Sequence, residues 1–188
     1  NGYSREWEEK AGKRGLLNLR NTAEALPYYK LDKNIELFRR HGVFTNRELL
    51  SRMEIAQENY KKIIVIEART TADMAKKQIY PAVNAYIADL CGIADGKAAY
   101  GADVSADKEL ISRLSAGNAA MYAAVEELVG AIREEEGLTL AEECAKFCAY
   151  RILPLMEKVR GLADGLEKDT AKEYWPMPTY SDILFSVE

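Results

Sequence analysis

Apolar residues recur at alternating steps of three and four between residues 111 and 132, and this pattern constrains the fold most. Its positions are Ile111, Leu114, Asn118, Met121, Val125, Leu128 and Ile132. Such spacing predicts a long helix with a coiled-coil-like seam over about three heptads. Asn118 is the one polar member of the seam. A polar residue there usually fixes register and partner at some cost in stability, and a ligand role is the alternative reading.

A second long helix is predicted to begin near residue 45. Thr45-Asn46-Arg47-Glu48 has the pattern of a capping box. Apolar residues then recur at steps of four and three, at Leu49, Met53, Ala56, Tyr60 and Ile63. The β-branched run at residues 63–66 suits a strand, but its flanks lack turn signals, which favours helix. Pro81 is expected to kink this helix rather than end it, and the glycines of residues 92–105 predict a loop.

A third long helix is predicted after Gly137, which ends the heptad helix. Thr139-Leu140-Ala141-Glu142 reads as a second capping box, so the two helices should form an antiparallel hairpin. Pro154 should kink the third helix, and Ile152-Leu153-Pro154 matches the earlier Ile79-Tyr80-Pro81. The expected buried positions are Leu140, Cys144, Phe147, Ile152, Leu155, Val159, Leu162 and Leu166.

Shorter elements are expected at both ends of the chain. Ser4 caps a first helix that stops at Gly15, a helical turn near residues 22–26 breaks at Pro27, and Asp32 caps a helix that ends at His41. A capping pattern at residues 179–182 opens a last helical turn. Trp175 and Phe185 are expected to pack back on their own bundle, the alternative being a neighbouring subunit or domain. The fold class is therefore all-α: three long antiparallel helices, two kinked at proline, with smaller N-terminal helices and a short C-terminal helical turn.

Charge and hydropathy exclude two classes of partner. The chain of 188 residues carries 26 Lys and Arg against 30 Asp and Glu, a formal net charge of −4. An acidic chain lacks the positive field that phosphate backbones require, so we expect no nucleic-acid partner. No apolar run approaches the ~20 residues of a membrane span, so we expect no membrane partner. Three cysteines without a secretion signal predict reduced thiols and a cytoplasmic location.

Side chains that can carry chemistry are few and scattered. Cys144 and Cys148 are four residues apart on one helix face, but the one histidine, His41, is distant in sequence, and a closed zinc site needs four ligands. We therefore expect both cysteines to be core residues. A polar cluster holds Glu67, Arg69, Thr70, Thr71 and Asp73. Glu67 falls seven residues after Tyr60, on the apolar seam, where it needs a partner: Arg69 or a basic residue from another helix. A structural ion pair is favoured over a catalytic one. We expect no catalytic, cofactor-binding or metal-binding residue in this segment.

Several motifs, in order, resemble the C-terminal part of the type III glutamine synthetases. They lie at residues 13–19, 21–26, 32–38, 41–45, 66–70, 73–76, 79–83 and 175–180, with the weakest likeness between about residues 92 and 140. Residues 42–45 (Gly-Val-Phe-Thr) with the preceding helix also look like the closing helices of the shorter glutamine synthetases. Leu17 stands where the family commonly has proline. Because the chain opens with Asn1 rather than Met, we expect it to be cut from something longer.

The resemblance implies a parent enzyme that joins ammonia to glutamate with ATP and Mg²⁺ or Mn²⁺, through a γ-glutamyl phosphate intermediate. The family's catalytic motifs lie upstream, so no catalytic residue is carried over to this segment. Residues 1–44 would end the catalytic domain, and residues 45–188 would form a helical extension with a structural, assembly or regulatory role. Its partners would be its own catalytic domain and neighbouring subunits of a homo-oligomeric double ring. A free-standing helical adaptor or oligomerisation module is the alternative, and an independent enzyme a third possibility.

Overall fold

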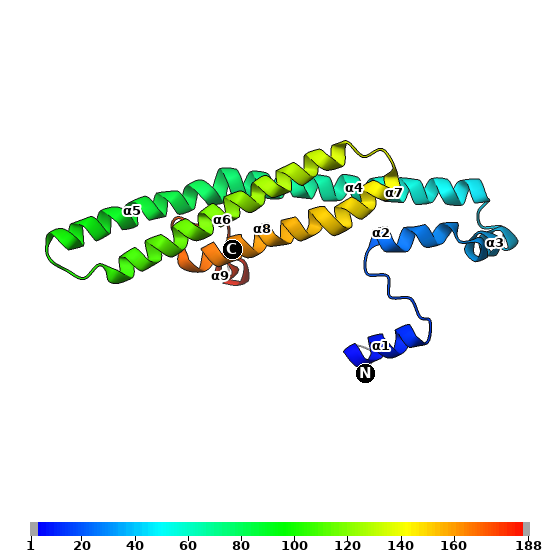
Figure 1. Ribbon diagram of the computed structural model, residues 1–188, viewed down its shortest axis with the longest axis horizontal. Helices are drawn as coiled ribbons and strands as arrows, with labels where there is room; N and C mark the ends of the chain where they lie inside the picture. The colour runs from blue at the N-terminus through cyan, green and yellow to red at the C-terminus, as the bar shows by residue number, and fades with distance from the viewer. Residues whose placement is uncertain (1–3, 186–188) are drawn as a thin grey trace. The chain divides into compact units, whose positions relative to one another are not determined.

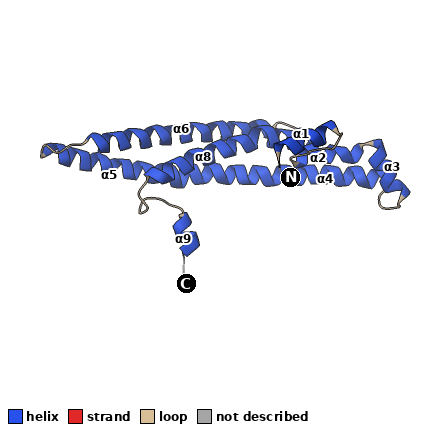
Figure 2. Ribbon diagram, turned by 90° about the horizontal axis from the view of Figure 1, so that it is seen from below, coloured by secondary structure: helices blue, strands red, loops and turns tan. Residues whose placement is uncertain are grey.

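A computed structural model describes residues 4–185, and all its regular structure is helical, with no strand among those residues (Figures 1 and 2). The all-α prediction is confirmed. None of the described helices is both long enough and apolar enough to span a membrane. The chain forms two compact units. The first holds residues 4–63 with Leu138–Ala149, and the second holds Ile64–Gly137 with residues 150–185.

The first unit opens with short helices. Helix α1 (Arg5–Lys13) is capped as predicted by Ser4, whose hydroxyl accepts from the Trp7 amide at 3.3 Å, and Gly15 follows it at φ +75°. Helix α2 (Thr22–Ala25) is capped by Asn21. The predicted break at Pro27 is wrong: the chain continues as the 3-10 helix η1 (Leu26–Lys30). Proline is tolerated in a first helical turn because the amide it lacks would have no partner there.

The capping predictions for the next two helices have opposite outcomes. Helix α3 (Asp32–Arg40) is capped by Leu31, so Asp32 lies in the first turn and is not the predicted cap. Helix α4 (Asn46–Met74) begins with the predicted capping box. The Glu48 amide donates to the Thr45 hydroxyl at 3.3 Å, and the Thr45 amide donates to the Glu48 carboxylate at 2.8 Å. The Thr45 amide, followed by the Thr45 hydroxyl, lowers the pKa of Glu48 by donating to its carboxylate.

The second predicted capping box does not form. Helix α7 (Ala141–Phe147) contacts α2 and is capped by Leu140 without a side-chain hydrogen bond. The Glu142 carboxylate instead contacts the Lys30 ammonium and, at 2.9 Å, that of Lys146, and both lower its pKa. Two ammonium groups outcompete one backbone amide for this carboxylate. Leu140 is 59 % exposed, so its predicted burial is also wrong.

The second unit is a bundle of long helices. The end of α4 leads through the π-helix η2 (Ala75–Ile79) into α5 (Tyr80–Ala99), which runs antiparallel beside α6 (Ser105–Glu136; Figures 1 and 2). The predicted loop at residues 92–105 is wrong for residues 92–99, where helix continues to Ala99, and right for residues 100–104, where the chain turns at Gly101, whose φ is +71°. The π-helix η3 (Cys148–Ile152), shared between the two units, leads into α8 (Leu153–Asp169), which packs on α6.

Each proline that was expected to kink a long helix follows a π-helical turn, and the two turns have the same length. Pro81 lies two residues after η2 ends, and Pro154 lies two residues after η3 ends. A proline inside a helix removes one amide donor and crowds the carbonyl one turn earlier, and a π-turn locally relieves that conflict. The short sequence match between the two sites therefore marks a repeated local structure, and both helices continue past their prolines.

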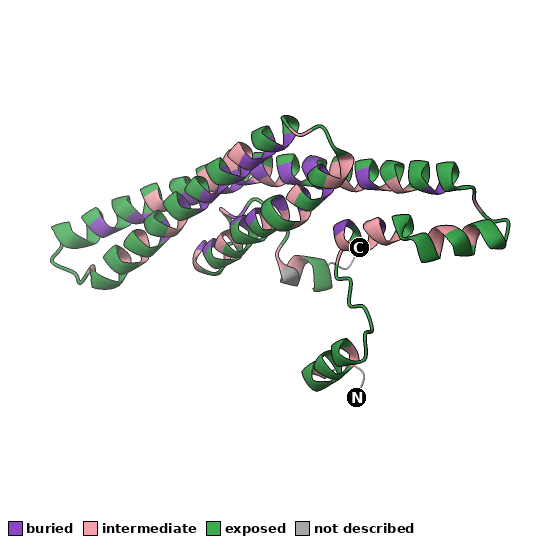
Figure 3. Ribbon diagram, turned by 45° about the vertical axis from the view of Figure 1, so that its right-hand side comes forward, coloured by how far each residue is buried: buried purple, intermediate pink, exposed green. Residues whose placement is uncertain are grey.

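The heptad seam forms the core of the second unit. Six seam residues of α6 are buried: Leu114, Asn118, Met121, Val125, Leu128 and Ile132. Ile111, at the N-terminal end of the seam, is half-buried. Figure 3 shows buried positions along the length of this bundle. The second half of α4 buries Ile64, Val65, Ala68 and Ala72. The predicted three-helix core is confirmed for this seam.

Candidate functional site

The acidic residues considered for chemistry lie on the surface. Glu67 is exposed, so its predicted place on the buried seam is wrong, as is that of Ile63, which is 56 % exposed. At about 3.6 residues per turn the buried face runs through Ile64 and Ala68, one position later than predicted. Arg69 does not pair with Glu67; its guanidinium contacts Glu136 at 2.7 Å. Asp73 pairs with Lys77 at 2.6 Å.

The histidine and the cysteines have structural positions. His41 is the C-cap of α3, and its amide donates to the Leu37 carbonyl at 3.2 Å. Cys144 and Cys148 are buried, which confirms their prediction as core residues, and Cys91 is exposed. Within residues 4–185, no group of three or more His, Cys, Asp or Glu side chains lies together in a way that suits a metal ion.

Asn118 is the one predicted residue that the fold places in a specific polar site. It is 2 % exposed on α6, and its side-chain amide donates at 3.1 Å to both the Tyr80 carbonyl and the Asn84 side-chain carbonyl. Its own carbonyl oxygen has no hydrogen-bond partner among the described residues. Tyr80 directly precedes Pro81, so the contact ties the seam of α6 to the start of α5. The register role predicted for Asn118 fits this contact.

Polar and aromatic contacts continue from Asn118 along α6. The Tyr122 ring lies 4.9 Å from the Tyr80 ring, and the Lys76 ammonium lies 5.5 Å from the Tyr122 centroid. Lys76 also contacts Glu126 and lowers its pKa. Three α6 residues at four-residue spacing thus meet three residues at the same spacing on η2 and α5. We call this set the register ladder: Lys76, Tyr80, Asn84, Asn118, Tyr122 and Glu126.

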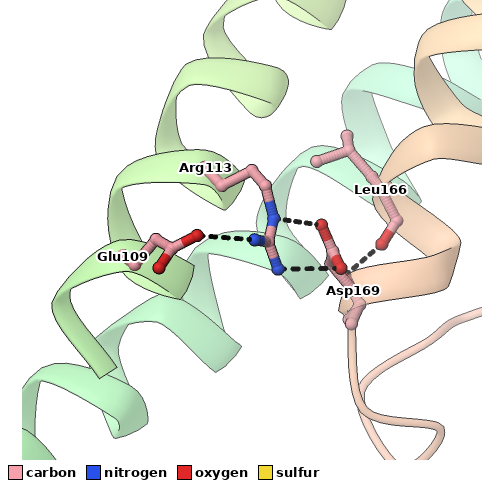
Figure 4. A network of polar contacts seen from close by, with 5 residues as sticks. Glu109, Arg113, Leu166 and Asp169 are labelled. Carbon is pink, nitrogen blue, oxygen red and sulfur yellow. Dashed lines mark hydrogen bonds and ion pairs between the residues drawn. The ribbon is translucent and has the colours of Figure 1, made fainter. Parts of the chain in front are cut away.

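Ion pairs fix α8 against the other side of α6. The Arg113 guanidinium makes two hydrogen bonds to the Asp169 carboxylate, at 2.7 and 3.1 Å, and reaches Glu109 at 3.5 Å (Figure 4). The two-point contact raises the pKa of Arg113. Lys158 and Glu127 pair at 2.8 Å. The two-point contact of Arg113 with Asp169 fixes the relative orientation of the two side chains as well as their distance.

The C-terminal tail folds back on the bundle through its first half. Trp175 is buried, which confirms its prediction, and the Tyr174 hydroxyl contacts Asp89 of α5. The predicted cap opens α9 (Tyr180–Phe185): the Thr179 amide and hydroxyl donate to Asp182 at 2.9 and 2.8 Å. With Lys172 they lower the pKa of Asp182 from 3.8 to about 2. Phe185 is 76 % exposed, so its predicted packing is wrong.

A groove of 760 Å³ lies between the end of α4 with η2, helix α8 and the tail. We call it the α8 groove, and its lining is mostly apolar. Its apolar lining residues come from three segments: Met74, Ala75 and Ile79 from α4 and η2, then Leu153, Met156, Val159 and Ala163 from α8, and Trp175, Met177, Pro178 and Ile183 from the tail. Its polar and charged lining residues are Thr71, Glu157, Arg160, Asp164 and Glu167. Pockets of this size and apolar character bind ligands or partner side chains. Sequence reasoning missed the groove; its one signal was the spread of methionines outside the seam.

Comparisons with known proteins agree with one another. A profile of the glutamine synthetase C-terminal domain matches residues 1–97. The chain is 38 % identical over its whole length to a glutamine synthetase of Butyrivibrio fibrisolvens, covering 27 % of that protein. It is 31 % identical to a type-3 glutamine synthetase of Dictyostelium discoideum and 30 % identical to a glutamine synthetase of Bacteroides fragilis (strain YCH46). Each match covers 98 % of this chain and 26 % of the relative. The chain thus spans about a quarter of these relatives' length, in their C-terminal part.

Proposed function

This chain belongs to the glutamine synthetase C-terminal domain family, and on that premise we propose that it is the non-catalytic helical C-terminal domain of a glutamine synthetase. The parent would form glutamine from glutamate, ammonia and ATP. The observation that carries the proposal is the coverage: relatives match this chain along 98–100 % of its length while 73–74 % of their own length lies outside the match. The catalytic residues would lie in that other part.

ATP and a divalent metal are proposed for the parent, and the residues of this chain do not fit the metal. Mg²⁺ and Mn²⁺ are bound mostly by carboxylates and water, and the described residues bring no three carboxylate, histidine or cysteine groups together. We therefore assign ATP and metal binding to the upstream part of the parent and derive no catalytic step here. Residues 1–44 would close the catalytic domain, and residues 45–188 would form the extension.

Two features of the chain support an assembly role. The bundle of the second unit is fixed internally by the register ladder and by the Arg113–Asp169 pair, so it can present a surface of constant shape. Large apolar side chains remain outside it, among them Ile66 at 63 %, Ile93 at 50 % and Leu184 at 70 % exposed. Apolar surface beyond what folding covers is typical of interaction sites. The partners would be the catalytic domain and neighbouring subunits of a cytoplasmic homo-oligomer.

A glutamine-forming assay with ATP, glutamate, ammonia and Mg²⁺ tests the proposal. It compares this 188-residue chain with the longer protein that its gene encodes. We expect activity in the longer protein alone. Activity in the chain itself would contradict the non-catalytic assignment and return attention to Glu67, Asp73 and His41. A gene that encodes no upstream synthetase sequence would favour the free-standing adaptor instead.

A further inference from the structure

The α8 groove is lined by apolar side chains from three segments of the second unit. Met74 and Ile79 come from α4 and η2, Met156 and Val159 from α8, and Trp175 from the tail. Methionine side chains are flexible and polarisable, so they adapt to partners of varied shape. The buried Trp175 places an indole at the groove, where it can report on an occupant.

Exposed apolar side chains also follow the last groove-lining residue along α9. Ile183 of α9 is a lining residue, and the next two residues along α9, Leu184 and Phe185, are 70 % and 76 % exposed. Figure 2 shows α9 projecting from the side of the bundle. A drug-sized molecule would be enclosed by the groove alone and would leave these side chains in water. The extent of the surface therefore favours a macromolecular segment over a small ligand.

The rim of the groove is acidic. Glu157, Asp164 and Glu167 of α8 are at the groove, against one basic residue, Arg160, which already pairs with Asp164 at 3.4 Å. Glu157 and Glu167 are ten residues apart, which is roughly 15 Å along a helix with a rise of ~1.5 Å per residue. This length corresponds to about three turns of an opposing helix. Basic residues two to three turns apart on such a helix would match the spacing of these two carboxylates along α8.

We propose that the α8 groove binds an amphipathic helix that has an apolar face flanked by lysine or arginine. The apolar face enters the groove and covers Leu184 and Phe185, while the basic residues meet Glu157 and Glu167. This is the helix-in-groove mode of recognition, with charge complementarity selecting the partner. The inference goes beyond the proposed function, since it assigns a binding site and its partner chemistry whether or not the parent forms glutamine.

Trp175 fluorescence in the 188-residue chain tests the proposal. Trp7 and Trp175 are the two tryptophans, so Trp7→Phe leaves Trp175 as the reporter. The probe is a designed helical peptide made only of leucine and lysine, with its leucines on one face. Its control replaces every lysine by glutamate. We expect the lysine peptide to change the Trp175 emission saturably and the glutamate peptide to leave it unchanged.

Two sets of variants separate groove binding from general attraction to an acidic protein. Glu157→Gln with Glu167→Gln should weaken lysine-peptide binding about fivefold or more. The matched pair Asp95→Asn with Glu134→Gln removes two exposed charges elsewhere and should not weaken it. Ala163→Phe, which fills the groove, should abolish the emission change, with circular dichroism confirming the fold.

Three outcomes would overturn the proposal. One is an unchanged Trp175 emission at saturating lysine peptide. Another is equal weakening by the two charge-removing pairs, which would reveal non-specific attraction. The third is a change in Trp175 emission with protein concentration alone, which would identify a second copy of the chain as the occupant. None of these depends on glutamine formation, so failure here and failure of the proposed function are distinguishable.

Discussion

The side-chain amide of Asn118 donates to the backbone carbonyl of Tyr80 at 3.1 Å, and Tyr80 immediately precedes Pro81. A buried polar side chain on the heptad seam thereby contacts the first residue of α5. The same amide also donates to Asn84. One residue of α6 thus fixes the register of α6 against α5.

Asn118→Asp is expected to destabilise the second unit by about 3 kcal/mol at neutral pH. The substitution puts a buried carboxylate where an amide donor met the Tyr80 and Asn84 oxygens, so attraction becomes repulsion. Urea denaturation measures the change. The loss should shrink at acidic pH, where the protonated carboxyl can donate again. Asn118→Leu, which exchanges two hydrogen bonds for apolar burial, should stay within about 1 kcal/mol of the wild type.

Replacing a glycine by alanine should have different effects on stability in α6 and in α8. A Cβ at Gly161 meets no atom within 4 Å, so Gly161→Ala should gain roughly 0.5–1 kcal/mol of stability from helix propensity alone. A Cβ at Gly117 would lie 3.0 Å from Leu166 Cδ2, in the contact between α6 and α8. In thermal unfolding, the melting temperature of Gly117→Ala should therefore be lower than that of Gly161→Ala. Equal gains would show that α6 and α8 are not closely packed at Gly117.

The two capping patterns give a matched pair of threonine variants. Thr45→Ala removes an observed cap and should cost about 1 kcal/mol. Thr139→Ala removes a threonine whose expected partner, Glu142, is engaged by Lys30 and Lys146, and it should change stability by no more than about 0.5 kcal/mol. Denaturant unfolding of both variants checks the difference. A larger loss at Thr139 would mean that the second cap forms after all.

The stability of the C-terminal tail depends on pH through the Asp182 carboxyl. Its pKa is lowered to about 2, so its ionised carboxyl stabilises the tail above the ordinary value of 3.8, and this contribution is lost as the pH falls toward 2. NMR titration of the Asp182 carboxyl measures the shift directly. Lys172→Met should raise the pKa part of the way back, because the Thr179 donors remain. A titration midpoint at the ordinary value in the wild-type chain would contradict these contacts.

Periodicity and capping patterns predicted most of the helices, and the errors have identifiable causes. The seam of α6 was read correctly because its heptad spacing leaves one face for burial. Gly92 and Gly96 were read as loop, yet they lie within α5 among good helix formers that outweigh them. Glu142 was read as a cap because its competitor Lys30 lies 112 residues away in sequence. Such a long-range partner is invisible to local patterns.

The candidate sites were less predictable than the helices. Asn118 was identifiable as an exception within a regular seam, but its partners Tyr80 and Asn84 became known only from the packing of α5 on α6. The α8 groove combines η2, α8 and the tail, which are far apart in the chain. Phe185 was expected to pack back on its own bundle because aromatic residues at the end of a domain usually do so, and no local pattern showed that its side chain is exposed.

The most direct test of the central claim is the native mass of the proposed full-length parent, compared with a version of it that ends at residue 44. If residues 45–188 serve assembly, the truncated protein should form smaller particles than the full-length protein in analytical ultracentrifugation or native mass spectrometry, at equal concentration and ionic strength. Truncated protein that assembles into particles of the same subunit number would contradict the account.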